Sequence, residues 1–574
     1  MFGFTVLKSS NPKHREILKK MFPNCQFVQL GDYIAINHMI DKFKEDKICY
    51  IDDNYLVMLD GVVFNKNYLK NFYHCDWIRT IIKMYEDKGN TFFDYFRGSF
   101  SGVLYDKYKD TLILFSDHIG SKFIYYLNQD DFSIMSSFIP NIYEFLKKTN
   151  TYYSLSVENA YVLLTYGYML ENRTLCSEIF KLRPGCYITI INDKLSERYY
   201  CRLNNEPVNI SDSDAIEMID EHFRSSLKLE FEKDIEYGYS QHLVALSGGL
   251  DSRMTSLVAH DMGYINQLNY TFSQSNYLDE TTPKKIAEDY GHEWIFKALD
   301  SGLWLLDFDY IVSQTGGNVL YFGSAHGNSL MKNLYIGDMG MFHTGLLGDV
   351  TIGRSYCGKT DNEQYKRLDG SFGGTLADKV RDVKFKETFE NREIGVLYNR
   401  GFSGIQNATQ VGYSLNESFA PFENIDLIKA CLQLPYHKTR EYYYKKWIIS
   451  KYPKAADYVW TGLKGAKITD RTININGRDV PLSQIIPRAK RFVLRRIVPN
   501  HMHVKKEGMN PIGYYLHSNM VLQKKINNYI SENIGLIQDT TLLSDLQKLC
   551  SGVNGIEKVQ AITLIEAVRQ FFTK

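Results

Sequence analysis

Residues 242–254 read His242-Leu-Val-Ala-Leu-Ser-Gly-Gly-Leu-Asp-Ser-Arg-Met254: a short apolar run, two glycines and then residues that favour helix. The run His242–Leu246 is typical of a buried parallel strand, and the apolar spacing from Leu250 onward predicts a helix. Gly248 and Gly249 let the backbone turn sharply and approach a ligand closely. A strand that leads through such a turn into a helix N-terminus forms an anion site, because free N–H groups and the positive end of the helix dipole point to the same place.

Two polar residues, Asp251 and Ser252, stand at the predicted start of this helix. A carboxylate beside a polyphosphate would repel it unless a divalent cation lies between them, which is an arrangement that Mg²⁺ prefers. No Gly-Lys-Ser/Thr follows the glycines, so the loop is not of the Walker type. A strand–turn–helix without any ligand is the simpler alternative, and the complete string of residues favours a nucleotide site over it.

The segment Ser247-Gly-Gly-Leu-Asp-Ser252 resembles the pyrophosphate loop (PP-loop) of ATP pyrophosphatases. These enzymes cleave ATP between the α and β phosphates, adenylate a substrate and release pyrophosphate. The loop alone is shared by asparagine synthetases, GMP and NAD synthetases, argininosuccinate synthetases and tRNA-thiolating enzymes. The resemblance implies ATP and Mg²⁺ as cofactors, Asp251 as a metal ligand and catalytic residue, and nucleotide contacts from Leu246, Ser247, Gly248, Gly249, Leu250, Ser252 and Phe272.

Length and composition place limits on the rest of the chain. Its 574 residues are enough for two or more domains, and a net charge of +1 gives no general indication of nucleic-acid or membrane binding. No apolar run reaches membrane-spanning length, and the N-terminus lacks the layout of a signal peptide. The nine cysteines are scattered without a Cys-x-x-Cys pair, which indicates a reducing cytoplasm and neither a disulfide framework nor a zinc site.

Residues 1–205 are predicted to be rich in β-strands, with Tyr55–Val63 and Thr111–Ser116 among the clearest strands. Their landmarks resemble, in order, the glutaminase domain of class II glutamine amidotransferases as fused in asparagine synthetases. The resemblance implies an Ntn-hydrolase-like αββα sandwich. The matching segments are Leu59-Asp-Gly-Val-Val-Phe-Asn65, Phe96-Arg-Gly-Ser-Phe100, Ser116-Asp-His-Ile-Gly-Ser-Lys-Phe-Ile-Tyr-Tyr126, Tyr166-Gly-Tyr168 and Lys181-Leu-Arg-Pro-Gly185.

The residues that carry glutaminase chemistry in this family are missing. The family's nucleophile is an N-terminal cysteine whose own amine serves as the base, and this chain has Phe2 at that place. The family's asparagine and glutamate of the Asn-Gly-Glu motif are Asp60 and Val62. No arginine near Asp32–Asn37 matches the family's binder of the glutamine carboxylate. We therefore expect a scaffold domain without glutaminase activity.

Residues 212–574 alternate between predicted helices and strands, which implies an open parallel sheet with ligands at the carboxyl ends of its strands. In this half Met341-Phe-His-Thr-Gly-Leu-Leu-Gly-Asp-Val350 resembles the family's Ser-Gly-Glu-Gly-(Gly/Ser)-Asp-Glu. The resemblance implies that Asp349 is the second magnesium ligand and a catalytic residue, and that Thr344 and Gly345 contact the nucleotide. A glycine-rich turn after a strand, without a ligand, is the alternative.

Two further positions bear on the chemistry. Leu346 replaces the family's glutamate, or the tyrosine of β-lactam synthetases, and leucine cannot transfer a proton. Trp460-Thr-Gly-Leu-Lys-Gly-Ala-Lys467 resembles the family's Arg-Pro-Lys-x-Gly-Phe. The resemblance makes Lys464 the lysine that stabilises the acyl-adenylate, although Lys467 is close enough to leave the register open.

The basic run Arg488–Lys506 could bind an anionic substrate, but such a run is more typical of a solvated helix face.

The sequence is thus identified as a member of the asparagine synthetase superfamily. The resemblance implies an α/β protein with two domains. Residues 1–205 would form a degenerate glutaminase-like domain, and residues 212–574 a PP-loop domain of the adenine nucleotide α-hydrolase-like type with a helical C-terminal part. We expect an ATP-dependent, AMP-forming amide ligase. Its partners would be a small-molecule, peptide or sugar carboxylate and an amine or ammonia, without nucleic acid; a homodimer stays open. A nucleotide-binding scaffold or regulator without catalysis is the competing hypothesis.

Overall fold

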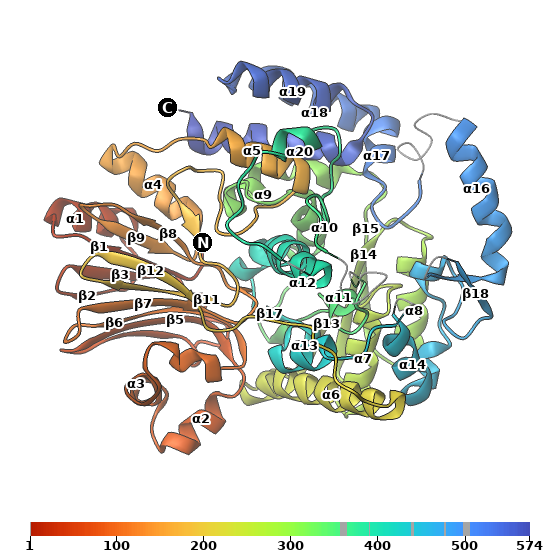
Figure 1. Cartoon of the computed structure of the whole chain (residues 1–574), viewed down its shortest axis with the longest axis horizontal. Helices are drawn as coiled ribbons and strands as arrows, with labels where there is room; N and C mark the ends of the chain where they lie inside the picture. Colours follow the sequence, from red (N-terminus) through yellow and green to blue (C-terminus); the bar gives the residue numbers. More distant parts are fainter. Residues whose placement is uncertain are drawn as a thin grey trace.

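The computed structural model describes residues 2–355, 357, 364–389, 391–437, 441–475, 478–497 and 506–573. Two antiparallel sheets form one side of the molecule, and a parallel sheet surrounded by helices forms the other (Figure 1).

The N-terminal side is built from two six-stranded sheets whose strands all pair antiparallel. The first sheet has the order β10-β8-β9-β1-β3-β2, with β1 Phe4–Lys8, β2 Phe27–Leu30, β3 Tyr33–Asn37, β8 Tyr125–Asn128, β9 Ser133–Ser136 and β10 Phe180–Lys181. The second has the order β12-β11-β7-β6-β5-β4, with β4 Ile48–Ile51, β5 Tyr55–Val63, β6 Gly98–Asp106, β7 Thr111–Ser116, β11 Cys186–Ile191 and β12 Lys194–Tyr199.

Strand β5 shows why these sheets stack into layers. Its side chains alternate between two hydrophobic cores: Leu56 and Met58 enter the core between the sheets, while Val57 and Leu59 enter the core under a helix. Helices cover both outer faces. Helices α1 (Pro12–Met21) and α4 (Ile139–Thr149) cover the first sheet, and α2 (Lys66–Tyr73) and α3 (Trp77–Lys88) cover the second. The predicted αββα sandwich is confirmed.

The second side is organised around a five-stranded sheet of order β15-β14-β13-β16-β17, in which every pair is parallel. Its strands are β13 Gln241–Ala245, β14 Gln267–Ser273, β15 Glu293–Ala298, β16 Met339–His343 and β17 Ser418–Phe419. Helices α6 (Asp212–Glu236), α7 (Asp251–Asp261) and α8 (Leu278–Tyr290) pack beside it. The predicted parallel sheet is confirmed, and the strand predicted at His242–Leu246 is observed at Gln241–Ala245.

The remaining elements are mostly helical, and apart from α5 they belong to the C-terminal half, where helices were predicted. They are α5 Val157–Tyr166, α9 Phe308–Thr315, α10 Phe322–Met331, α11 Gly348–Thr351, α12 Arg392–Val396, α13 Ile425–Leu432, α14 Tyr442–Lys451, α15 Pro453–Ala456, α16 Ile485–Ile497, α17 Ile512–Ser518, α18 Met520–Asn533, α19 Thr540–Ser551, α20 Gly555–Ala567 and the hairpin β18 (Thr472–Ile475) and β19 (Arg478–Pro481). Part of the basic run Arg488–Lys506 falls on α16. Residues 498–505 of this run lie outside the described part of the chain. None of the described helices combines the length and the apolar character needed to cross a membrane.

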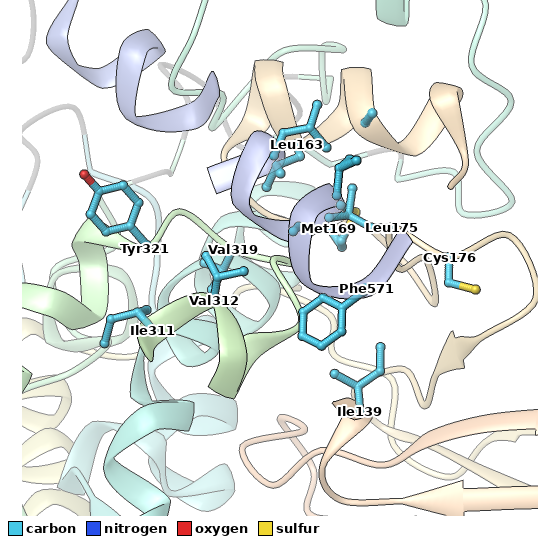
Figure 2. Close-up of a cluster of buried hydrophobic side chains, with 14 of the residues drawn as sticks. Ile139, Leu163, Met169, Leu175, Cys176, Ile311, Val312, Val319, Tyr321 and Phe571 are labelled. Carbon is cyan, nitrogen blue, oxygen red and sulfur yellow. The ribbon is translucent and has the colours of Figure 1, made fainter. Parts of the chain in front are cut away.

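One hydrophobic core joins the two sides of the molecule. It contains Ile139, Leu163 and Leu175 from the N-terminal part, and Ile311 and Phe571 from the C-terminal part (Figure 2). Helix α5 packs against α20, although almost 400 residues separate them in the chain (Figure 1). The sandwich and the parallel sheet are therefore packed as one body.

Candidate active site

The carboxyl ends of β13, β14 and β16 meet at one edge of the parallel sheet, where open α/β sheets bind their ligands. A cavity of about 470 Å³ opens there. Among the predicted site residues, those that line it are Leu246, Ser247, Gly249, Asp251, Ser252, Phe272, Thr344 and Gly345. Gly248 and Leu250 belong to the same loop and are buried in the protein.

The loop between β13 and α7 is held by hydrogen bonds to the side chains of Ser247, Ser252 and Asp279. The backbone N–H of Ser247 donates to Ser252 Oγ at 3.0 Å, and Gly249 N–H donates to Ser247 Oγ at 3.1 Å. Gly248 N–H donates to Asp279 Oδ1 at 2.8 Å. A Cβ on Gly248 would lie 2.1 Å from Thr461 Oγ1, so a side chain there would displace the neighbouring loop. The glycine is thus required by a close approach of two loops.

Asp251, which is half-buried, and Asp349, which is exposed, form an acidic pair beside this loop. Burial and repulsion from Asp349 hold the pKa of Asp251 well above its usual range. Burial likewise raises the pKa of Asp349, with Arg400 acting in the opposite direction and Glu441 adding to the rise. A Cβ on Gly348 would lie 2.5 Å from Asp251 Cγ, so the Asp251 carboxylate sits directly against the residue that precedes Asp349.

These two carboxylates fit a hard divalent cation. Oxygen donors of this kind are the ligands that Mg²⁺ prefers, and a cation between them would remove the repulsion from Asp349 that contributes to the raised pKa of Asp251. The Tyr444 hydroxyl donates to Asp251 Oδ1 at 2.8 Å, which leaves the second carboxylate oxygen of Asp251 for another partner. The residues present are consistent with a magnesium site at the start of α7.

The acidic pair leads to a prediction about stability. A carboxyl whose pKa is raised in the folded state binds more protons there than in the unfolded state, so stability falls as pH rises above the unfolded pKa near 3.8. At pH 7 without metal the charged Asp251 carboxylate therefore destabilises the fold. We expect Asp251→Asn in EDTA to unfold at a higher temperature than the wild type at pH 7.

The difference between the two unfolding temperatures should shrink as the pH is lowered toward 3.8, and Mg²⁺ should raise the melting temperature of the wild type more than that of the variant. Thermal unfolding followed by calorimetry measures both effects. A variant that is less stable than the wild type at pH 7 in EDTA would contradict the repulsion described above.

Lys464 lies on a loop that contacts the PP-loop. Thr461 N–H donates to the Gly248 carbonyl at 3.0 Å, and Lys464 follows three residues later with an exposed side chain and a left-handed backbone. Lys464 is not among the described residues that line the cavity. Its neighbour Lys467 forms an ion pair with Asp457 at 3.0 Å and lines a different surface depression. The catalytic role of Lys464 stays a prediction.

Sequence reasoning missed three residues of the site. Arg253 is buried directly after the PP-loop, where its guanidinium donates to the carbonyls of Ala455 at 3.1 Å and Val459 at 2.6 Å and so fixes the loop to another segment. Tyr444 comes from α14, and Arg400 from the helical segment η4 (Leu397–Ile405). Arg253 could have been found from the sequence, because it directly follows Asp251 and Ser252. Nothing in the sequence connects Tyr444 or Arg400 with the loop.

The place of the family's nucleophile in the sandwich is filled. The Phe2 ring is buried and packs edge-on against Phe138 and Tyr413, with ring centroids 5.3 Å and 6.1 Å away. Asp60 does not face a solvent-filled pocket either. It belongs to a buried ion cluster with Lys47, Lys122 and Glu417.

This cluster is held by four contacts. Lys122 Nζ lies 2.7 Å from Glu417 and 3.3 Å from Asp60, while Lys47 Nζ lies 2.8 Å from Glu417 and 3.9 Å from Asp60. Glu417 immediately precedes β17 of the parallel sheet, whereas Asp60 lies on β5 of the sandwich. The cluster therefore ties the two sides of the molecule together.

Comparison with known proteins finds similarity to glutamine amidotransferases and to asparagine synthetases. The profile of a glutamine amidotransferase domain family matches residues 41–201. A putative glutamine-hydrolysing asparagine synthetase of Methanocaldococcus jannaschii is 24% identical over 294 residues, which are 48% of this chain and 55% of the relative. An asparagine synthetase of Bacillus subtilis is 27% identical over 273 residues, 43% of this chain and 34% of the relative. The chain thus spans about half of the first relative's length and a third of the second's.

Among solved structures, similarity is found to the glutamine phosphoribosylpyrophosphate amidotransferase of B. subtilis, which was complexed with ADP and GMP. The sequence identity is 8%, the match covers 51% of this chain and 65% of the other, and the TM-score is 0.25. A second structure, described as the allosteric regulatory enzyme of purine biosynthesis, matches with a TM-score of 0.24 at 8% identity over 51% of this chain and 74% of that one.

Proposed function

Because this chain is a member of the asparagine synthetase superfamily, we propose that it is an ATP-dependent carbon–nitrogen ligase that forms AMP and pyrophosphate. The observation that supports this most directly is the acidic pair Asp251 and Asp349 beside the PP-loop, because two neighbouring carboxylates repel each other unless a cation lies between them. We place the boundary between the glutaminase-like and the synthetase-like domain between residues 205 and 212.

In the proposed reaction a substrate carboxylate attacks the α phosphorus of ATP, the bond to the β-phosphate oxygen breaks, and pyrophosphate leaves with the electron pair. The PP-loop from Ser247 to Ser252, at the N-terminus of α7, would bind the phosphates through backbone groups and the helix dipole. Asp251 and Asp349 would hold Mg²⁺, which when bound neutralises charge that builds on the leaving pyrophosphate.

The second half of the reaction transfers the acyl group to nitrogen. An amine attacks the acyl-adenylate carbonyl, the amide bond forms, and AMP leaves. Lys464 would stabilise the adenylate and the tetrahedral species, because a mobile ammonium can follow the negative charge from phosphate to oxyanion. Leu346 lines the cavity where relatives carry a proton-transferring residue, so the proton of the amine would pass to the substrate or to another group.

The nitrogen donor in this proposal is ammonia, an amine or an amino group of the substrate itself, and the protein does not hydrolyse glutamine. The buried Phe2 ring and the ion-paired Asp60 support this part, because they fill the place where the family binds and attacks glutamine. A carboxylate neutralised by two buried lysines is not free to contact a glutamine amide.

The test of this function is release of pyrophosphate by the purified protein with ATP, Mg²⁺ and a metabolite extract, using ammonium or glutamine as the nitrogen source. We expect pyrophosphate and AMP in equal amounts with ammonium or with the extract's own amines. Addition of glutamine should not increase the amounts of pyrophosphate and AMP. Formation of glutamate only when the protein is present would contradict the loss of glutaminase activity.

A nucleotide-binding scaffold without catalysis is the second candidate, and Leu346 is the observation that favours it, since a leucine at that place supplies no proton transfer. Isothermal titration with MgATP separates the two hypotheses. A scaffold would bind nucleotide and release no pyrophosphate under any condition, whereas the ligase should do both.

A further inference from the structure

The cavity continues beyond the PP-loop into a second compartment with apolar walls. One end is formed by the strand ends and the PP-loop, and the other lies between the Gly167–Tyr168 turn, Leu320, Phe372 and the helical segments η4 and η5 (Gln406–Ser414). The walls of this second compartment are mostly aliphatic or aromatic and come from Leu320, Phe322, Phe372, Ile405, Ala408 and Val411. A compartment with such walls gains most from a ligand that buries apolar surface there.

The charges along the cavity limit what it can bind. Of the described residues that line it, Asp251 is the one Asp or Glu, and Arg400 is the one Lys or Arg. Burial lowers the pKa of His326 to about 4, so this lining imidazole is neutral near pH 7. With Asp251 assigned to the metal, no carboxylate of the lining is left for a substrate ammonium, and a buried ammonium without a partner is strongly disfavoured.

Arg400 lines the cavity beside its apolar walls. Its guanidinium carbon is 3.8 Å from the centroid of the Phe372 ring in the apolar compartment. Burial raises the pKa of Asp349, and the positive charge of Arg400 opposes that rise. The guanidinium therefore also interacts electrostatically with the acidic pair. A planar guanidinium is suited to hold one carboxylate with two hydrogen bonds. A substrate carboxylate on Arg400 would thus have its body in the apolar compartment and its oxygens toward the phosphates.

We propose that the adenylated substrate is a monocarboxylic acid with an apolar aliphatic or aromatic body, held through its carboxylate by Arg400. This inference rests on the proposed ligase function and narrows its substrate class. The bond that forms joins a carboxylate oxygen to the α phosphorus, and pyrophosphate leaves as described above. Aspartate is excluded by the same reasoning, because it would bring an ammonium and a second carboxylate into a compartment that offers a single cation.

Gly412 allows a steric test of this assignment. It lines the cavity, and a Cβ built on it has no heavy atom within 4 Å, so a larger side chain would extend into open space. Gly412→Leu should therefore fill part of the apolar compartment. Gly535→Leu is the matched control, because a Cβ there also meets nothing within 4 Å and the residue lies in η9 (Ile534–Leu536), outside the cavity lining.

The measurement is ATP–pyrophosphate exchange by the full chain with propionate, hexanoate, phenylacetate, aspartate and glutamate, together with calorimetric MgATP binding. We expect exchange with hexanoate and phenylacetate and none with the two amino acids. Gly412→Leu should lower kcat/KM for phenylacetate at least about tenfold relative to propionate, because one or two misplaced methylenes already change binding by that factor. The affinity for MgATP should not change, and Gly535→Leu should behave like the wild type.

Arg400→Gln provides a second, independent readout. It should raise KM for the acid at least about tenfold while KM for ATP stays within twofold, since a hydrogen bond to a charged group is worth about 1.5–3 kcal/mol. Arg400→Lys should recover part of the loss. A change in KM for ATP alone would assign Arg400 to the triphosphate and overturn its role here.

The outcomes separate this inference from the function on which it rests. Exchange with aspartate in preference to the apolar acids, exchange that is indifferent to Gly412→Leu, or MgATP binding without exchange by any apolar acid each contradicts the substrate class. If MgATP does not bind to the wild type at all, the ligase proposal itself is wrong.

Discussion

Asp251→Asn is expected to lower the rate of pyrophosphate formation by about 10²–10³, the loss that follows when one group that stabilises transition-state charge is removed. The carboxylate lies at the start of α7, beside the PP-loop and against Gly348. An asparagine has nearly the same shape, and its side-chain oxygen can still accept the hydrogen bond from Tyr444. The substitution therefore removes a charge and little else, so the loss should appear in kcat with the fold intact.

The matched control is Asp261→Asn, which makes the same chemical change at the last residue of the same helix. Asp261 is exposed and pairs with Arg224 at 2.7 Å, away from the cavity lining. Its variant should retain the activity of the wild type. Pyrophosphate release by Asp251→Asn within a few-fold of the wild type, measured with saturating Mg²⁺, would show that the acidic pair is not part of the reaction.

Lys122→Met is expected to reduce the free energy of unfolding by about 3–5 kcal/mol, the cost of leaving buried charges without their partner. Burial alone lowers the pKa of Lys122, but Asp60 and Glu417 raise it above the ordinary value of a lysine, so the ammonium is charged throughout the range of stability. All four side chains of the ion cluster are at most 4% exposed. Water cannot replace the lost cation, so the two carboxylates would share Lys47 alone.

Two comparisons isolate this effect in urea and thermal unfolding. Lys109→Met removes a lysine that is 55% exposed and pairs with Asp106, so it should cost less than about 1 kcal/mol. Lys122→Met combined with Glu417→Gln removes one charge of each sign and should be more stable than Lys122→Met alone. Equal stability of the two lysine variants would mean that the cluster is solvated and does not tie the sheets together.

The local parts of the site could be predicted from the sequence because their residues are neighbours in the chain. The PP-loop lies within six consecutive residues, Ser247–Ser252, and Asp349 follows a strand in a recognisable string. Alternating or continuous apolar runs gave the strands at Tyr55–Val63 and Thr111–Ser116 with the same bounds as in the structure. Short-range patterns of this kind do not depend on how distant segments pack.

The parts that could not be predicted are contacts between distant segments. Arg400 lies 149 positions beyond Asp251 on a helical segment with no motif of its own, and Tyr444 reaches Asp251 from α14. The cluster that joins Asp60 and Glu417 through two lysines is likewise visible only in three dimensions, although the resemblance had already indicated that Asp60 stands where the family has the asparagine of its Asn-Gly-Glu motif. Lys464 remains a prediction from motif register.

The core shared by the two sides has a consequence for synthesis of the chain. The Tyr153 hydroxyl donates to the carbonyl of Phe571 at 2.7 Å, and 418 residues separate the two. At ribosomal rates of about 5–20 residues per second, synthesis takes about 20–80 s to pass from α5 to α20. During this time the apolar faces of α4 and α5 lack the helix that covers them in the folded protein. Nascent chains of this protein therefore expose a hydrophobic surface long enough for chaperones to bind it.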